Sequence, residues 1–195
     1  MAKIGLSNLL WAELTEAQDG TPTYDGAKTL GKAVSANVSI TNNSATLYAD
    51  NVLAESDTSF QTGTITCGVD NDLDATFAEL LGHTITEAGV VTKSAEDTPI
   101  WVGLGRIITK MVSGVLYYKA EVLYKVKFAE PSQDDSTKGE SIEFATPEIE
   151  GTIATLADGK WCTSQTFTEK SDALEFIQTI FTAPTAQNAG GNAVG

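Results

Sequence analysis

Several segments of the chain alternate between apolar and polar residues with a period of two, which predicts strands that bury one face. The longest run places a set of alternate residues on one apolar face: Leu116, Tyr118, Ala120, Val122, Tyr124, Val126 and Phe128. Upstream, residues 100–109 are apolar on both faces, and Gly114 supplies a turn between the two runs. We therefore predict a β-hairpin over residues 100–128. We expect the core to cover one face of its first strand and another subunit to cover the other.

Shorter runs predict further strands. Residues 34–41 place Val34, Ala36, Val38 and Ile40 on one face and the small polar residues Ser35, Asn37, Ser39 and Thr41 on the other. Ile65, Cys67 and Val69 repeat the pattern, and so do Ile149 and Ile153 after a phase change at Pro147, where a bulge or bend is expected. Residues 157–160, Ala-Asp-Gly-Lys, are typical of a hairpin turn before a strand that carries Trp161 and Phe167.

Two segments have the spacing of short amphipathic helices. In the first, apolar residues recur at helical intervals before a glycine that predicts the end of the helix: Leu73, Phe77, Leu80, Leu81 and then Gly82. The second follows Ser171 and places Leu174, Ile177 and Phe181 on one stripe. The fold class predicted from these patterns is mainly β with minor α.

The connection between residues 42 and 59 shows neither pattern clearly, and we predict a long loop there. Loops of this length are usually functional. This one carries apolar residues and an acid near its centre: Leu47, Tyr48, Asp50, Val52 and Leu53. Because a merely solvated loop would be more polar, we expect these side chains to meet a partner. The remaining chain is predicted to be one β domain over residues 1–182, followed by a tail, 183–195, that is flexible or ordered by a partner.

Composition agrees with a globular protein, at 42% hydrophobic and 19% charged residues. No apolar run is long enough to span a membrane, no secretory signal is visible, and two cysteines cannot form a disulfide framework. The formal net charge is −14, and the acids are concentrated in residues 1–92, with three basic and twelve acidic side chains, and in residues 139–195, with two and eight. Such a protein repels phosphate, so tight binding of nucleic acid is not expected.

The sequence offers little to support catalysis or metal binding. Asp70, Asp72 and Asp74 match the start of a calcium loop, but Ala75 and Leu81 occupy positions that require glycine and glutamate. His83 is the only histidine, just after a helix end, and is expected to be structural. Glu148 and Glu150 share a strand face, as in a glycosidase pair, but an acidic surface is the simpler interpretation. We therefore predict no enzyme, no catalytic residue, no cofactor and no metal.

The order of several segments resembles the phi13-type family of major tail proteins from long-tailed phages. The segments are SANVS (35–39), NSATLYADN (43–51), AELLGH (78–83), LYKVKFAEP (123–131), TKGESIEFATP (137–147) and DGKW (158–161). No single segment is diagnostic, and the resemblance lies in their number and order over roughly residues 5–165. The sequence departs from the family pattern after Asp50, where further acids are common, and in its uncharged tail.

The resemblance implies a tail-tube β-sandwich or partial barrel that completes an inner barrel in a ring of six copies. Stacked rings would form the conduit for DNA during ejection, with a tape measure protein in the lumen and terminator and distal tail proteins at the ends. The protein would be part of the virion, assembled in the host cytoplasm without membrane contact. Residues 42–59 would then contact the adjacent ring.

Two polar faces are candidates for the lumen, where carboxylates and small polar groups would keep DNA from adhering. One is Ser35, Asn37, Ser39 and Thr41, and the other is Glu148 and Glu150. Alternative functions are a tube protein of a contractile tail or tailocin-like device, and a monomeric β-sandwich that acts as a binding or adhesin module. The sequence does not separate the two kinds of tube.

Overall fold

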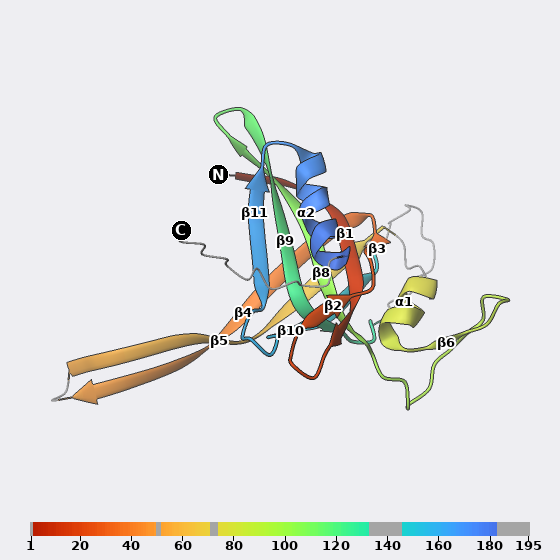
Figure 1. Cartoon of the computed structure of the whole chain (residues 1–195), viewed down its shortest axis with the longest axis horizontal. Helices are drawn as coiled ribbons and strands as arrows, with labels where there is room; N and C mark the ends of the chain where they lie inside the picture. The colour runs from red at the N-terminus through yellow and green to blue at the C-terminus, as the bar shows by residue number, and fades with distance from the viewer. Residues whose placement is uncertain (1, 50–51, 71–73, 133–145, 183–195) are drawn as a thin grey trace, which may run out of the picture.

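A curled β-sheet with two helices makes up the described part of the chain, which confirms the expected fold class (Figure 1). The computed structural model describes residues 2–49, 52–70, 74–132 and 146–182, with the backbone alone at 45–49 and 52–57. The strands of the main sheet are β1 (Ala2–Glu16), β2 (Pro22–Tyr24), β3 (Lys28–Gly31), β4 (Ala33–Ala49), β5 (Val52–Val69), β8 (Trp101–Val112), β9 (Val115–Phe128), β10 (Glu148–Ala154) and β11 (Cys162–Phe167). The helices are α1 (Asp74–Leu81) and α2 (Lys170–Thr182), and β6 (Thr84–Ile85) pairs with β7 (Val91–Thr92).

The main sheet has the order β2-β1-β8-β9-β10-β5-β4, and all of its pairings are antiparallel. β3 pairs with β1, and β11 pairs with β9 beside β10. The hairpin of β8 and β9 forms as predicted, with Ser113 and Gly114 at positive φ in its turn. The sequence patterns did not predict β1, although this strand buries Leu9, Leu10, Trp11, Ala12 and Leu14.

The expected hairpin turn at residues 157–160 does form a turn, but it joins no hairpin. Gly159 has a φ of 82° and donates its backbone N–H to Leu156. The strands on either side, β10 and β11, both pair with the same edge of β9. Ala154 lies opposite Lys125 and Cys162 lies opposite Leu123, so β10 and β11 continue one line along β9, interrupted by a loop. The predicted hairpin there is wrong.

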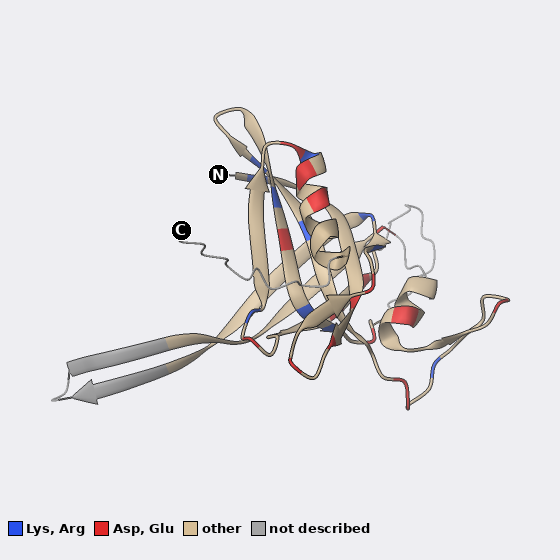
Figure 2. Cartoon of the chain, in the orientation of Figure 1, with Lys and Arg blue, Asp and Glu red and all other residues tan. Residues whose placement is uncertain are grey.

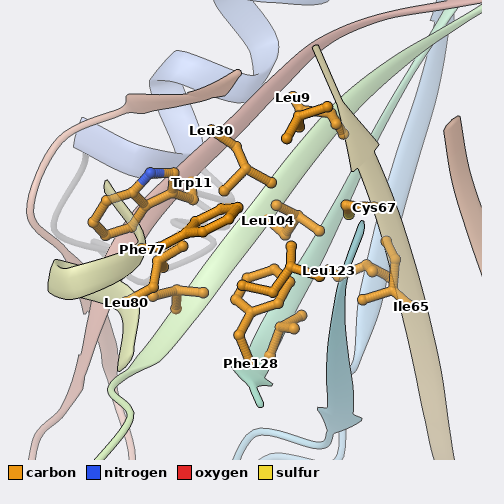
Figure 3. Close-up of a cluster of buried hydrophobic side chains, with 14 of the residues drawn as sticks. Leu9, Trp11, Leu30, Ile65, Cys67, Phe77, Leu80, Leu104, Leu123 and Phe128 are labelled. Atoms are coloured by element: carbon orange, nitrogen blue, oxygen red, sulfur yellow. The ribbon is translucent and has the colours of Figure 1, made fainter. Parts of the chain in front are cut away.

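The inner face of the curled sheet encloses the main hydrophobic core, to which β1, β3, β5, β8, β9, β10 and α1 all contribute (Figure 3). Trp11 and Phe128 are among its largest fully buried side chains. α1 ends before Gly82, which has a φ of 77°, and buries Phe77, Leu80 and Leu81 as predicted. The predicted Leu73 lies outside the described residues.

The outer face of the β8–β9 hairpin is covered by α2, which corrects the expectation that another subunit covers it. Ile177 and Phe181 of the helix are fully buried in a second core with Ile107 and Val122. The approach is so close that a Cβ at Gly105 would lie 2.4 Å from Cγ2 of Ile177. The second apolar face of residues 100–109 is therefore explained within the chain.

Two bulges change which residues share a face. Between Val102 and Leu104 the pairing of β8 with β9 shifts by one residue. Tyr118, Ala120, Val122 and Tyr124 therefore pack under α2, whereas Val126 and Phe128 turn into the inner core. The prediction that all of these residues share one face is wrong.

A second bulge, between Ala33 and Ser35 in β4, displaces Val34. Val34 is 51% exposed, while Ala36, Val38 and Ile40 pack against the core as predicted. The apolar face of this strand is therefore shorter by one residue than its sequence indicates.

Candidate functional site

Residues 42–59 form a two-stranded ribbon instead of the predicted loop. β4 and β5 remain paired from Ala33 with Val69 out to Ala49 with Val52. β10 supports β5 only from Gly63 to Gly68. Beyond this support the two strands project from the body of the protein (Figure 1). We call this part, Asn42–Ala49 with Val52–Phe60, the distal ribbon.

Four of the five residues predicted to contact a partner belong to the distal ribbon: Leu47, Tyr48, Val52 and Leu53. In the backbone register, Leu47 lies opposite Glu55, and Tyr48 lies opposite Leu53. Val52 lies opposite Ala49, and Asp50 lies outside the described residues. The predicted loop is therefore wrong, and the contact of these residues with a partner stays a prediction.

The base of the ribbon is fixed to the body by an aromatic stack. Phe60 in β5 stacks on Trp161, with ring centroids 4.7 Å apart and an angle of 7° between the planes. Thr62 Oγ1 donates a hydrogen bond to the carbonyl of Ile153 in β10. Phe60 is the innermost β5 residue of the distal ribbon, and Thr62 lies just outside the ribbon, toward the body, so these contacts fix the ribbon at its base.

The two candidate lumen faces prove to be one surface. Two rows of residues run across β10, β5 and β4. The first row is Glu150, Thr66 and Asn37, and the second is Thr152, Thr64 and Ser39. Such cross-strand partners project from the same side of a sheet. We call this surface the polar face: Ser35, Asn37, Ser39, Thr41, Thr62, Thr64, Thr66, Glu148, Glu150 and Thr152. Of the predicted lumen residues, only Ser35 is half-buried, and the others are exposed.

One border of the polar face is basic. Lys127 in β9 lies between Thr152 of β10 and Trp101 of β8 in the register. The ammonium groups of Lys125 and Lys127 lie 5.0 and 5.2 Å from the ring centre of Trp101. Lys125 also forms an ion pair with Glu16. The charge of this surface therefore changes from acidic on β10 to basic on β9, and only its β10 part fits the expected acidic lumen.

A cleft of about 590 Å³ lies between β4 and the first residues of β1, and its floor holds an ion-pair network. Arg106 is 7% exposed and donates from Nε to Glu121 at 3.0 Å. Its Nη1 donates to the carbonyl of Ala36 in β4 at 2.9 Å, so the side chain joins the two layers of the curled sheet. Lys119 Nζ donates to the second carboxylate oxygen of Glu121 at 2.6 Å.

The network keeps Glu121 charged. Burial by itself raises the pKa of this carboxyl, but the hydrogen bond from Lys119 and the charge of Arg106 outweigh it and hold the pKa below its ordinary value. Cys162 also lines the cleft, and burial raises the pKa of its thiol to about 11. A thiol with that pKa is a poor nucleophile at neutral pH. The arrangement is therefore a structural clamp without an activated nucleophile.

His83 has contacts that hold loops together, in agreement with a structural role. Its backbone N–H donates to Ala78 at the end of α1. Its ring nitrogens lie 2.7 Å from a carboxylate oxygen of Asp97 and 2.9 Å from one of Glu130. The ring thereby connects the end of the helix to two separate loops. Sequence patterns gave no sign of these two acids, because they are distant along the chain.

The described ranges show neither a metal-binding cluster nor a helix that could cross a membrane. No group of three or more His, Cys, Asp or Glu side chains in the described ranges is placed to hold a metal ion. Neither of the described helices has the length and apolar character needed to cross a membrane.

Comparison with known proteins adds little to the geometry. No family model matches the sequence, and no curated protein matches it. Among solved structures, the chain is similar to the tube-terminating cap of the anti-feeding prophage. The identity is 12%, the match covers 86% of this chain and 93% of that chain, and the TM-score is 0.42. A likeness of that size does not establish a family for this chain.

Proposed function

We propose that the chain is the repeating subunit of a phage tail tube, a structural virion protein with no enzymatic activity. Six copies form a ring, rings stack, and DNA passes through the lumen during ejection. The proposal starts from the ordered set of sequence segments that resemble the major tail proteins. Its structural support comes from the surfaces that the isolated chain leaves without partners.

The distal ribbon is the observation that carries the proposal. Within the described residues, its two strands pair only with each other. A lone two-stranded hairpin is marginally stable in water. A ribbon of this length is therefore expected to be stabilised by another chain, and one that projects from the body can reach an adjacent copy.

The free edge of β4 supports the same proposal. β4 is the last strand in the sheet order, so the described residues supply no strand to its outer edge. Unpaired edges favour pairing between chains. If edge strands of neighbouring subunits pair, the six curled sheets form a continuous barrel, which removes these edges. The polar face would then line the lumen, with the tape measure protein inside and terminator and distal tail proteins at the ends.

Negative-stain electron microscopy of the purified full chain at increasing concentration tests the proposal. We expect rings or tubes of uniform diameter. A species that stays monomeric at every concentration, with other tail proteins added as well, contradicts it. A monomer that instead binds a cell surface or glycan indicates the adhesin alternative.

A further inference from the structure

A second projection of the molecule exposes apolar side chains. The turn of the β8–β9 hairpin and the adjacent start of β1 carry four large apolar residues that are at least 40% exposed: Ile4, Met111, Val115 and Leu116. Met111 lies opposite Leu116 within the hairpin, and Ala2 of β1 lies opposite Met111. We call these four residues the apolar tip. In the register, Met111 and Leu116 project from one side of the hairpin and Val115 from the other. Exposed apolar side chains gathered at one projection often mark an interaction site.

The apolar tip is accompanied by two lysines that lack a counter-charge. Lys3 in β1 lies directly opposite Lys110 in β8. Like charges in directly opposed positions of a sheet destabilise the pair. Neither lysine forms an ion pair within the described residues, whereas most other described cations pair with a carboxylate, as Lys28 does with Glu79. Lys127 and Lys170 likewise form no ion pair in the described ranges, but only Lys3 and Lys110 lie opposite each other on paired strands. The net charge of the chain is −14, and Figure 2 shows where its basic and acidic residues lie.

The distal ribbon has the complementary composition. Its sequence combines Leu47, Tyr48, Val52 and Leu53 with two acids, Glu55 and Asp57, and contains no lysine or arginine. The two acids lie two residues apart on β5, opposite Leu47 and Ala45 in the register. The ribbon therefore offers apolar residues and negative charge. The apolar tip offers apolar residues, and Lys3 and Lys110 beside it offer positive charge.

From this complementarity we infer that the distal ribbon of one copy docks on the apolar tip of the next copy, with Glu55 and Asp57 neutralising Lys3 and Lys110. The inference rests on the proposed function and names the surface that receives the ribbon. In Figure 1 the hairpin turn lies at the top of the view and the ribbon extends toward the lower left, so the two projections leave the body in different directions. Contacts between two different surfaces are head-to-tail, and they extend into an open stack when the rotation between copies does not close a ring.

Charge reversal in two separate variants tests the docking. One full-length variant carries Lys3→Glu with Lys110→Glu, and the other carries Glu55→Lys with Asp57→Lys. Each variant alone presents like charges at the contact, so we expect the concentration needed for assembly to rise by about tenfold or more. Mixed in equal amounts, each ribbon meets a tip of opposite charge, so we expect assembly near the wild-type concentration. Sedimentation velocity and electron microscopy provide the measurements.

Lys32→Glu with Lys170→Glu is the matched control for the tip variant, since it changes the net charge equally at two exposed lysines that belong to neither surface. Circular dichroism melting verifies that each variant folds. If the wild type forms tubes and the Lys3→Glu/Lys110→Glu variant assembles equally well, the docking inference is wrong. That result does not contradict the proposed tube function. Folded variants that remain unassembled after mixing also overturn the docking. A wild-type chain that never assembles overturns both the docking and the proposed function.

Discussion

Arg106 lies directly opposite Glu121 in the register of β8 and β9, and its guanidinium also reaches the carbonyl of Ala36 in β4. One side chain thereby connects the two layers of the curled sheet. Both members of the pair are largely buried, with side-chain exposures of 9% and 12%. A buried ion pair of this kind contributes little over a well-packed apolar pair, but removal of one member is costly.

Arg106→Met should therefore destabilise the fold by about 3 kcal/mol, because it leaves Glu121 buried with Lys119 as its remaining cation. The double variant Arg106→Met/Glu121→Leu should recover most of the loss. Urea denaturation of the wild type, Arg106→Met, Glu121→Leu and the double variant gives the coupling free energy between the two side chains. Equal stability of the single and double variants would show that the buried charge is not the cause.

The ion pair of Arg106 and Glu121 should make the stability of the fold depend on pH in the acid range. The pKa of Glu121 in the folded protein lies below its ordinary value of 4.5. Its stabilising contribution is therefore complete above that ordinary value and is lost as the pH falls through the lower folded value. The stability difference between wild type and Glu121→Gln should shrink when urea denaturation is repeated between pH 7 and pH values below the ordinary pKa. A difference that stays constant over this range contradicts the assignment.

Gly105 should tolerate no side chain, because its Cβ would overlap Ile177 of α2. Gly105→Ala is expected to cost about 1–3 kcal/mol through overpacking. The cost should be smaller in an Ile177→Ala background, where the obstructing methyl is absent. Gly5→Ala is the control, since a Cβ at Gly5 meets its nearest neighbour at 3.6 Å, an ordinary contact. Equal thermal shifts at the two glycines would contradict the packing argument.

Shortening the distal ribbon should separate folding from assembly. Replacement of residues 44–58 by Asn-Gly joins the paired residues Asn43 and Ser59 through a two-residue turn and retains the stack of Phe60 on Trp161. We expect a folded chain with an unchanged thermal midpoint that no longer forms stacks. Tubes of normal length in electron micrographs would rule out a stacking role for the ribbon.

The polar face predicts how a tube would treat DNA. Glu148→Lys/Glu150→Lys places two positive charges where the proposed lumen has two negative ones, so DNA should be retained and ejection slowed. The matched control is Glu169→Lys/Glu175→Lys at α2, which changes the net charge equally on exposed positions of another face. Filter retention of short DNA on assembled tubes provides the measurement. Equal retention by the two variants argues against a lumen at the polar face.

The sequence predicted much of the fold wherever one local pattern decided the structure. The β8–β9 hairpin, α1 and α2 follow from alternation, helical spacing and the glycines at their ends. The errors arose where tertiary packing decided. The bulge opposite Gly103 turns Val126 and Phe128 away from the face of Tyr124, and a period of two continues unchanged in the sequence there.

The candidate site shows the same division. The polar residues of β4 and β10 were identified separately, but only strand order places them on one surface. Residues 42–59 were assigned to a loop because their pattern is weak, although β4 and β5 pair throughout their described backbone. Arg106 and Glu121 were missed, and the available signal was a single arginine within the apolar run 100–109. Lys3 was missed because no pattern identified β1.

The interruption between β10 and β11 has a practical consequence for engineering. β10 ends at Ala154, opposite Lys125 of β9, and β11 begins at Cys162, opposite Leu123. The two ends of the intervening loop are therefore close together along β9. The ends of this loop are therefore fixed by the sheet, whatever its length, and each doubling of a flexible loop costs only about 0.6 kcal/mol. Exposed Asp158 and Gly159 form its turn. A peptide epitope or a small binding domain inserted between these two residues would be displayed without any change in strand register.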